Sequence, residues 1–140
     1  MIRPRLVLVD DDVNFCFAFQ KALEGYNASI RVTVYNNGAE LIEALGQISV
    51  RDKPQLILMD LDMPRMNGIE TTKAIRQNEQ YRAVPILLLT RSEQPSDVEK
   101  AYQMGVNAFI SKPFSYAEIK QTVQQIGDYW LMTGQLPGGA

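Results

Sequence analysis

Two clusters of aspartates are the residues of this sequence best suited to chemistry. Each cluster directly follows a short aliphatic run, at residues 6–9 and 56–59. The members are Asp10, Asp11 and Asp12 in the first cluster, and Asp60 and Asp62 in the second. Two carboxylates about 4 Å apart repel each other by roughly 4 kcal/mol at an effective dielectric of about 20, so converging carboxylates need a cation or a shared proton. We therefore expect these aspartates to hold a divalent metal ion.

The elements that must bring the two clusters together are short strands separated by helices. Runs rich in Val, Ile, Leu or aromatic residues predict strands at residues 5–9, 29–35, 55–59, 85–89 and 106–110. Strands that alternate with helices form parallel βαβ units with right-handed crossovers. The sequence therefore predicts an α/β fold, a doubly wound five-stranded parallel sheet with helices on both faces. Both clusters would emerge at carboxyl ends of strands, where open parallel sheets place their ligand crevices.

Four of the predicted helices begin with a capping side chain that is followed three positions later by glutamate, the pattern of the reciprocal capping box. The pairs are Asn37 with Glu40, Asn67 with Glu70, Ser96 with Glu99, and Ser115 with Glu118. Asp12 is expected to cap the first helix and not to bind metal.

The composition limits the class of protein. With 140 residues, 46% of them apolar, the chain can bury one core, so we expect a single domain at residues 1–132 and a flexible tail at residues 133–140. Fourteen basic and sixteen acidic residues give a net charge of −2 without a long run of either sign, which argues against a nucleic-acid partner. No apolar run is long enough to cross a bilayer, and Cys16 is the single cysteine, so we expect no membrane partner and a cytoplasmic location.

Polar residues also follow the last two predicted strands. Thr90 comes directly after residues 85–89, and Lys112 lies two positions after residues 106–110. The sequence contains no histidine, so the chemistry falls to Asp, Lys, Thr or Ser. A site with several acids, a hydroxyl and an ammonium group suits phosphoryl transfer, because charge must be balanced around the metal and the transferred oxygens. Asp60 is the best candidate nucleophile.

In order and spacing, these residues resemble the response-regulator receiver domain over nearly the whole chain. The matching segments are Val9-Asp10-Asp11, Met59-Asp60, Met63-Pro64-x-Met66-x-Gly68, Leu89-Thr90 and Phe109-x-x-Lys112-Pro113-Phe114. The resemblance implies a flavodoxin-like receiver fold and a role in two-component, phosphorelay signal transduction. It also implies a stand-alone signalling protein that is not an enzyme, because it catalyses only its own phosphorylation and dephosphorylation.

The resemblance implies a role for each acidic residue of the site. Asp60 would be the phosphoacceptor, taking a phosphoryl group from a sensor histidine kinase or a phosphotransfer protein. Asp11 and Asp60 would bind Mg²⁺ directly, Asp10 would bind it through water, and Asp62 would bind it through its backbone carbonyl. Mg²⁺ suits this set because it usually takes one or two carboxylates and keeps several waters.

The resemblance also implies a switch. Lys112 would pair with an acceptor oxygen and then with the phosphoryl group, and Thr90 would donate a hydrogen bond to that group. The movement of Thr90 toward the phosphoryl group would let Phe109 turn inward. This change would remodel the surface that an unknown downstream protein binds. The bond from Lys112 to Pro113 is expected to be cis, although only about 5–6% of such bonds are cis in general. Arg91, where the family usually has a small residue, would either shield the phosphoryl group or point to solvent.

The first and last predicted helices carry more apolar residues than one buried stripe needs. In the first, Phe17 is expected to reach the surface as a docking patch for the kinase. In the last, a 4-3-4 spacing predicts core side chains at Ile119, Val123, Ile126 and Trp130. Beyond that stripe lie Tyr129, Leu131 and Met132, which would either form a homodimer contact or fold back onto their own domain. The ending of this helix also has a short resemblance to single-domain regulators paired with phytochrome-like sensor kinases.

Two other functions remain open from the sequence. Residues 56–62 also resemble the first motif of haloacid-dehalogenase-type phosphohydrolases, with Asp60 as nucleophile and Asp62 as acid. That family places its nucleophile on the first strand, whereas here an acidic strand end precedes Asp60, so the order favours the receiver. The other alternative is a receiver-like binding module that is not phosphorylated, but all the site residues are retained.

Overall fold

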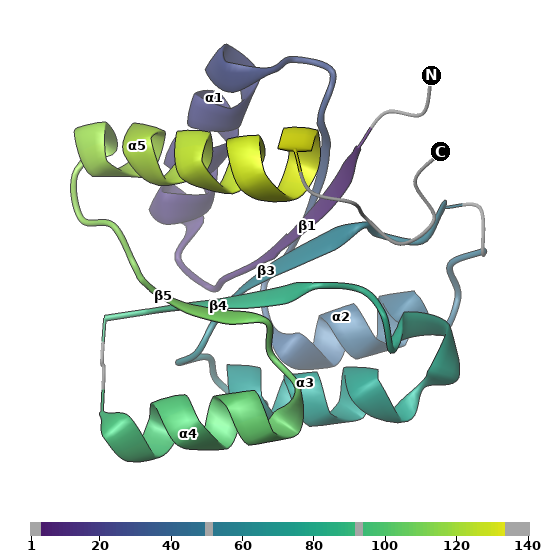
Figure 1. The fold of residues 1–140 in the computed structure, drawn as a ribbon. Coiled ribbons are helices and arrows are strands. Elements are labelled where there is room, and N and C mark those ends of the chain that lie inside the picture. Colours follow the sequence, from purple (N-terminus) through teal and green to yellow (C-terminus); the bar gives the residue numbers. More distant parts are fainter. Residues whose placement is uncertain (1–3, 50–51, 92–93, 134–140) are drawn as a thin grey trace.

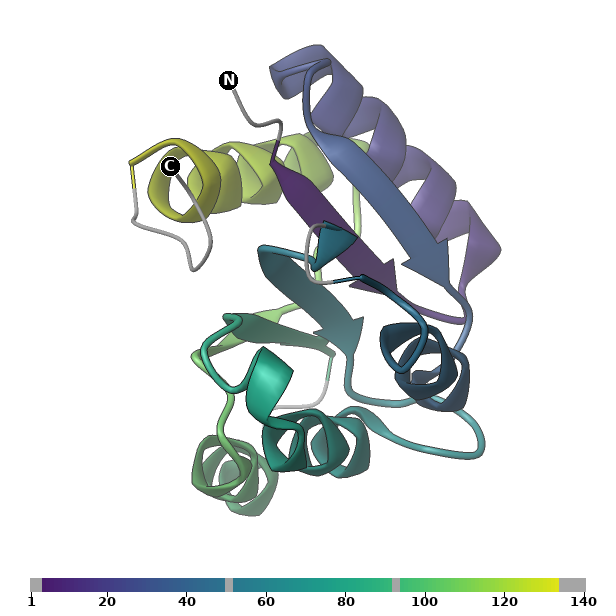
Figure 2. The ribbon, with the colours of Figure 1, turned by 90° about the vertical axis from the view of Figure 1, so that its right-hand side faces the viewer.

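A five-stranded sheet lies between two layers of helices (Figures 1 and 2). The computed structural model describes residues 4–49, 52–91 and 94–133. The strands are β1 (Arg5–Val9), β2 (Arg31–Tyr35), β3 (Leu56–Asp60), β4 (Ile86–Thr90) and β5 (Ala108–Ser111). The helices are α1 (Val13–Tyr26), α2 (Gly38–Leu45), α3 (Gly68–Gln77), α4 (Pro95–Met104) and α5 (Tyr116–Ile126). Two further segments are η2 (Glu79–Tyr81), a 3-10 turn, and η3 (Gly127–Thr133), a π-helical continuation of α5.

The strands run parallel in the order β2-β1-β3-β4-β5. The predicted doubly wound α/β fold is therefore confirmed. The order reverses between β1 and β3, and a doubly wound sheet binds its ligands outside the carboxyl ends of the strands at such a reversal. Both aspartate clusters follow these two strands. Within the described residues, no helix is both long and apolar enough to cross a membrane.

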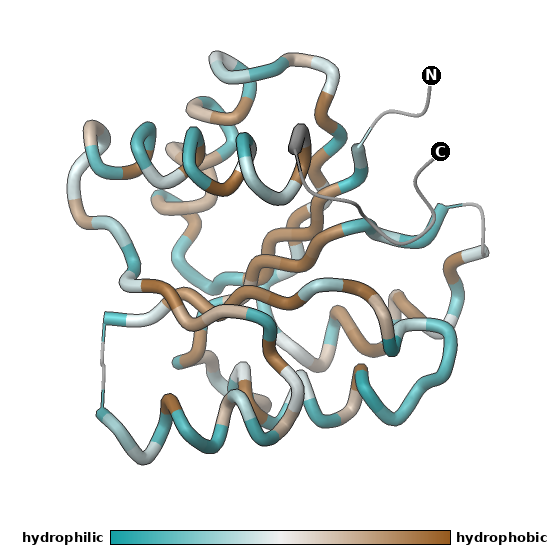
Figure 3. Tube along the Cα trace, in the orientation of Figure 1, coloured by the Kyte–Doolittle hydropathy of each residue, from teal (hydrophilic) through white to brown (hydrophobic). Residues whose placement is uncertain are grey.

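Each face of the sheet has its own core, because successive strand residues point to opposite faces. The strands β3 and β4 are buried along their whole length, which is why they read as continuous aliphatic runs. Figure 3 shows these hydrophobic residues along the middle of the molecule. One core packs α1 and α5 against strand residues such as Leu8, Leu58 and Leu87. The other packs α2, α3 and α4 against strand residues such as Val9, Met59 and Leu88.

Most of the predicted helix caps are confirmed. Asp12 caps α1, and Asn37 caps α2. Complete capping boxes start α3 and α5, at Asn67 with Glu70 and at Ser115 with Glu118. Glu40 accepts a hydrogen bond from the Asn36 N–H, so the α2 pair is not the predicted reciprocal box. The prediction at Ser96 and Glu99 is wrong, because α4 begins at Pro95 and no side chain caps it. Proline with its fixed φ is favoured at this first helical position.

The carboxyl end of the chain departs from the predicted stripe. Ile119, Val123 and Ile126 are buried as predicted, but the next buried side chain is Leu131, and Trp130 is only half-buried against the same core. The π-helical segment widens the repeat, so a five-residue step from Ile126 reaches the core. Leu131 therefore folds back onto its own domain, while Tyr129 is 63% exposed. The side chain of Met132 and residues 134–140 of the predicted tail lie outside the described part of the chain.

Candidate functional site

Three aspartates meet at the reversal point of the sheet. Asp10 directly follows β1, and Asp60 is the last residue of β3, the neighbouring strand. One carboxylate oxygen from each of Asp10, Asp11 and Asp60 lies within 4.8 Å of the other two. Asp10 and Asp60 are 1% and 7% exposed, whereas Asp11 faces solvent. The cluster thus has a buried floor and an open side through which an ion can enter.

The other two aspartates of the sequence clusters do not join this group. The Asp12 side chain accepts a hydrogen bond from the Phe15 N–H at the start of α1, in keeping with the cap role that we predict for it. The Asp62 side chain is exposed, and its backbone N–H is hydrogen-bonded to the Asp60 carboxylate. Asp62 therefore contacts the site through its backbone, and its side chain is not one of the clustered ligands.

The loop after β3 is held close to Asp60 by Gly68, the first residue of α3. Its N–H donates a hydrogen bond of 2.8 Å to the Leu61 carbonyl. A Cβ placed on Gly68 would lie 2.8 Å from the carbonyl oxygen of Asp60 and 3.0 Å from the Leu61 Cα. Only glycine fits such an approach without moving the backbone. The nearby Met63 is 8% exposed and packs into the core under α2, α3 and α4, which anchors the loop from the other side.

Lys112 reaches the same group of carboxylates from the end of β5. Its Nζ lies 2.6 Å from Asp10 Oδ2 and 3.7 Å from Asp60 Oδ2. Its backbone N–H donates to the Thr90 carbonyl at 2.8 Å, which joins the ends of β4 and β5. The expectation of a cis bond before Pro113 is wrong, since no peptide bond in the described residues is cis. The trans form is the lower-energy one, and the Lys112 side chain reaches the cluster with it.

The electrostatics of the site leave negative charge uncompensated. Burial raises the pKa of Asp60 to about 7, the charge of Asp10 adds to this effect, and Lys112 opposes it. Burial also raises the pKa of Asp10, again against the influence of Lys112. Asp10 Oδ2 is buried, and its close partner within the described residues is the Lys112 ammonium, which pairs with it as an ion. Three carboxylates beside one ammonium group suit a hard divalent cation with oxygen ligands.

The predicted switch residues lie beside this rim. Thr90 is fully buried at the end of β4. Phe109 in β5 is half-buried against the core beneath α4, and its N–H donates to the Tyr102 hydroxyl at 3.2 Å. Arg91 is exposed, with its guanidinium 4.9 Å from the centre of the Phe114 ring. The exposed guanidinium of Arg91 agrees with the interpretation that this side chain points to solvent.

Phe15 also belongs to the site, although the sequence singles it out only as an apolar residue of the first helix. Its ring lies beneath the Lys112 ammonium, 4.5 Å from Nζ to the ring centre. One signal was available, because the predicted cap at Asp12 places Phe15 in the first turn of the helix that starts at the aspartates. The partner of Phe15 lies almost one hundred positions away, which is why spacing alone does not reveal the contact.

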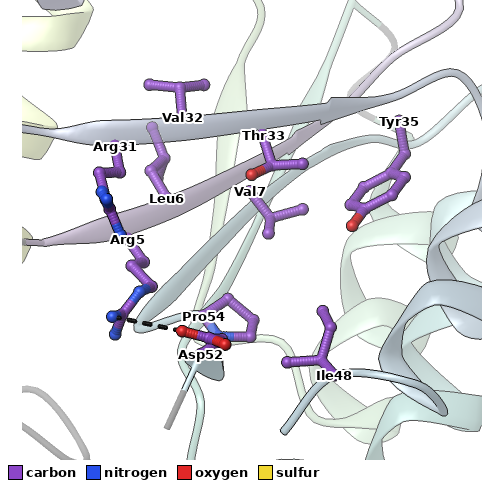
Figure 4. A pocket seen from close by; sticks show the side chains of 10 residues that line it. All are labelled: Arg5, Leu6, Val7, Arg31, Val32, Thr33, Tyr35, Ile48, Asp52 and Pro54. Atoms are coloured by element: carbon purple, nitrogen blue, oxygen red, sulfur yellow. Dashed lines mark ion pairs between the residues drawn. The ribbon is translucent and has the colours of Figure 1, made fainter.

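A separate cleft of about 560 Å³ lies along β1 and β2, beginning at the Arg5 end of β1 (Figure 4). Arg5 and Asp52 form an ion pair of 3.6 Å at its edge, and Val7, Ile48 and Pro54 line it. No aspartate of the cluster lines this cleft. The lining extends along β2 to Tyr35, whose carbonyl accepts a hydrogen bond from the Asp10 N–H, but it includes none of the clustered carboxylates, so the cleft is not part of the site.

Comparison with known proteins supplies relatives of matching length. The Probable methanogenesis regulatory protein FilR2 of Methanothrix harundinacea is 31% identical over 137 residues, which cover 96% of this chain and 88% of that protein. Response regulator Rcp1 of Synechocystis sp. is 28% identical over 135 residues, which cover 94% of this chain and 92% of Rcp1.

Solved structures share the fold over the same length. The structure of the phosphorylated cyanobacterial phytochrome response regulator RcpA has a TM-score of 0.89 at 27% identity and covers 98% of this chain and 100% of that one. The Mn²⁺-bound form of Rcp1 has a TM-score of 0.86 at 28% identity and covers 96% of this chain and 99% of that one. The family model of the response regulator receiver domain matches residues 6–124. The chain therefore belongs to the response regulator receiver domain family.

Proposed function

We propose that this protein is a phosphoacceptor response regulator in which Asp60 takes a phosphoryl group from a sensor histidine kinase or a phosphotransfer protein. The supporting observation is the buried Asp60 carboxylate, which shares a rim with Asp10, Asp11 and the ammonium of Lys112. The product is an aspartyl phosphate, formed when a carboxylate oxygen of Asp60 attacks the phosphorus and the donor group leaves. The protein catalyses this transfer to itself and its later hydrolysis, and no turnover of an external substrate is proposed.

Mg²⁺ is the proposed cofactor. Asp10, Asp11 and Asp60 would hold it with their carboxylates, Asp10 through water, and Asp62 would contribute its backbone carbonyl. When bound, the ion offsets the repulsion among the carboxylates and the charge of the incoming phosphoryl group. The residues fit an oxygen-liganded divalent ion, because one oxygen from each of the three carboxylates lies within 4.8 Å of the others beside a single ammonium group. Burial raises the pKa of Asp60, and the charge of Asp10 adds to this effect. The solved Mn²⁺-bound form of the related Rcp1 supports a divalent ion as a ligand of this protein.

The surrounding residues would sense the phosphoryl group. Lys112, already 3.7 Å from Asp60 Oδ2, would pair with a phosphoryl oxygen as a compact point charge. Thr90 would donate a hydrogen bond to the same group. A phosphoryl group adds about 1.5 to 2 negative charges, enough to draw the Thr90 loop inward and let Phe109 follow. The surface formed by α4, β5 and α5 would then change for a downstream protein.

Exposed apolar side chains on α1 and around the start of α5 suit the phosphodonor. They are Val13, Phe17, Phe114 and Tyr116, which are 72%, 60%, 72% and 48% exposed. The exposure of Phe17 agrees with the patch predicted for it. Val13 and Phe114 follow the site residues closely in the chain, so a kinase or phosphotransfer domain seated here would lie next to Asp60. A phytochrome-like sensor kinase is the proposed donor, in view of the similarity to RcpA.

Assembly and location complete the proposal. A homodimer would use the C-terminal helix region, where Tyr129 stays exposed after Leu131 has folded into the core. The proposed location is the cytoplasm. Neither nucleic acid nor membrane is proposed as a partner.

The phosphohydrolase alternative is not favoured. In that reading the Asp62 side chain acts as acid beside Asp60, but it is exposed and lies outside the carboxylate group. The unphosphorylated binding module has no specific observation in its favour.

The test is incubation with Mg²⁺ and acetyl phosphate, followed by mass spectrometry to locate the label. We expect one phosphoryl group at Asp60, no label in Asp60→Asn, and retained label in Asp62→Asn. Multiple turnover of small phosphate esters that is lost in Asp62→Asn would instead favour the hydrolase. Absence of any adduct would leave only the binding module.

A further inference from the structure

We propose that Phe15 is a positioning residue of the site. Its ring holds the Lys112 ammonium against Asp10, and a divalent ion that enters the aspartate cluster must displace the ammonium from that place. This inference rests on the proposed function insofar as it takes Asp10, Asp11 and Asp60 as the divalent-ion site. Beyond that function, the contact between Phe15 and Lys112 would set the affinity of the site for the divalent ion.

The Phe15 ring and the Lys112 ammonium are in direct contact, and both side chains are shielded from solvent. The Lys112 Nζ lies 4.5 Å from the centre of the Phe15 ring, and the two side chains are 6% and 5% exposed as whole residues. The face of an aromatic ring carries negative potential, and its attraction for a cation is stronger when both groups are shielded from water. The ring is therefore a second partner for the ammonium besides the carboxylates.

The ring has little freedom to move away. The Phe15 N–H donates to Asp12 Oδ1 at 3.0 Å, and the Asp12 N–H donates to Asp10 Oδ1 at 2.9 Å. The ring also packs against Phe19, with 5.7 Å between the ring centres. The same loop thus fixes both the carboxylate of Asp10 and the ring of Phe15. The Lys112 ammonium contacts both of them.

The ammonium and a metal ion compete for the same oxygen. Asp10 Oδ1 is engaged by the Asp12 N–H, so Oδ2 is the oxygen left to face an ion or a water bound to it. Lys112 Nζ lies 2.6 Å from Oδ2, and no other described group donates a hydrogen bond to it. A divalent ion at the cluster repels the Lys112 ammonium and, directly or through a bound water, replaces it as the partner of Asp10 Oδ2. Asp60 Oδ2, at 3.7 Å, is the acceptor toward which Lys112 would then move.

The decisive experiment replaces Phe15 with pentafluorophenylalanine, which keeps the shape of the ring but reverses the charge of its face. Weakening the hold on Lys112 should raise the affinity for Mn²⁺, measured by calorimetry without phosphodonor, by about 2- to 30-fold. Phe17 and Phe19 are the matched controls. Phe17 is exposed with Lys21 5.4 Å from its ring centre, and Phe19 is fully buried and touches Phe15. The same replacement at either control should leave the affinity within twofold.

A double-mutant cycle separates the cation contact from a packing effect. In a Lys112→Met background, which keeps an unbranched stem but removes the charge, fluorination of Phe15 should no longer change Mn²⁺ affinity. An affinity that is unchanged or lowered by fluorination at position 15, or a rise that persists in Lys112→Met, would overturn the inference.

A measurement on the unmodified protein guards against a variant that fails to fold. The ε-methylene protons of Lys112 should resonate upfield because of the Phe15 ring, and should return toward the free lysine position when Mg²⁺ is added. Resonances that do not move with Mg²⁺ would contradict the displacement. Absence of divalent-ion binding would overturn this inference together with the metal part of the proposed function. Absence of label at Asp60 affects only the phosphoacceptor role, because these measurements use no phosphodonor.

Discussion

Gly68 packs directly against the backbone of Asp60: a Cβ on Gly68 would lie 2.8 Å from the Asp60 carbonyl oxygen. Since the atoms in the way belong to backbone, a side chain here must push α3 away from the end of β3. We predict that Gly68→Ala lowers the free energy of unfolding by about 1–3 kcal/mol, the range for overpacking, and weakens Mn²⁺ binding by displacing Asp60. Urea unfolding and calorimetry measure the two effects.

The matched control is Gly25→Ala. Gly25 lies in α1, and a Cβ on it would meet nothing within 4 Å. Because alanine favours the helix over glycine by about 1 kcal/mol, this change should leave stability unchanged or raise it, and metal binding should be unaffected. Equal destabilisation by the two substitutions would show that the close approach to Asp60 is not the cause.

Lys112→Ala should separate phosphorylation of Asp60 from the conformational change that follows it. The Lys112 ammonium lies nearer to Asp10 than to Asp60, and a bound Mg²⁺ would replace the positive charge that Lys112 places beside Asp60. We predict that Lys112→Ala still accepts a phosphoryl group at Asp60 but no longer changes conformation. Mass spectrometry follows the label, and amide resonances of β5 and α4 follow the response. An unchanged phosphorylation-dependent shift in this variant would remove Lys112 from the switch.

The buried Asp60 predicts a specific pH dependence of stability without metal. Its pKa is about 7 in the folded protein and about 3.8 when unfolded, so between these values the folded state binds more protons. Stability should therefore fall as pH rises from 4 to 7, with a slope of at most about 1.4 kcal/mol per pH unit from this group. A divalent ion binds the deprotonated carboxylates, so the stabilisation by Mg²⁺ should grow over the same interval.

Urea unfolding at pH 5, 6, 7 and 8, with and without Mg²⁺, checks this prediction. Asp60→Asn should flatten the fall in stability, and only the smaller contribution of Asp10, whose pKa is also raised, should remain. If Asp60→Asn and the unsubstituted protein show the same pH dependence, the carboxyl of Asp60 does not titrate in this interval.

The sheet and the aspartate site are predictable from the sequence for a simple reason. A buried parallel strand must be apolar throughout, so the run ending at Met59 marks a strand and Asp60 marks its end. Asn67 and Ser115 likewise announce their helices, because a cap satisfies backbone groups only a few residues away. These signals are local in the sequence. The parallel strand order then places the residues at the strand ends together at one edge of the sheet.

Interactions between distant segments account for what the sequence does not reveal. Arg76 in α3 is an example, because its guanidinium is partly desolvated and pairs with no carboxylate of the residues that the structure describes. It donates instead to the carbonyls of Tyr81, Arg82, Val84 and Gly105 and to the side chain of Asn107. No spacing rule connects these positions. The misplaced stripe at Trp130 is a second example, since the π-helical segment contacts α1, where the Tyr26 hydroxyl donates to the Asp128 carboxylate at 2.6 Å.

The hydrogen bond from the Phe109 N–H to the Tyr102 hydroxyl yields the last prediction. Within the described sheet, β5 is an edge strand with β4 as its one neighbour. An outward N–H on such a strand has no strand partner, and the Tyr102 hydroxyl accepts it at 3.2 Å. Tyr102 therefore ties α4 to the predicted switch residue through backbone as well as through packing.

We predict that Tyr102→Phe speeds hydrogen exchange of the Phe109 amide by about fivefold, the effect of losing a hydrogen bond worth about 1 kcal/mol. Tyr116→Phe is the matched control, because Tyr116 in α5 is also 48% exposed. The control should leave the Phe109 amide unchanged. Amide exchange measured by NMR at both positions decides the matter: equal exchange of Phe109 in the two variants would mean that the hydroxyl does not hold β5. Faster exchange in Tyr102→Phe alone would identify this bond as a restraint on the backbone of the predicted switch residue Phe109.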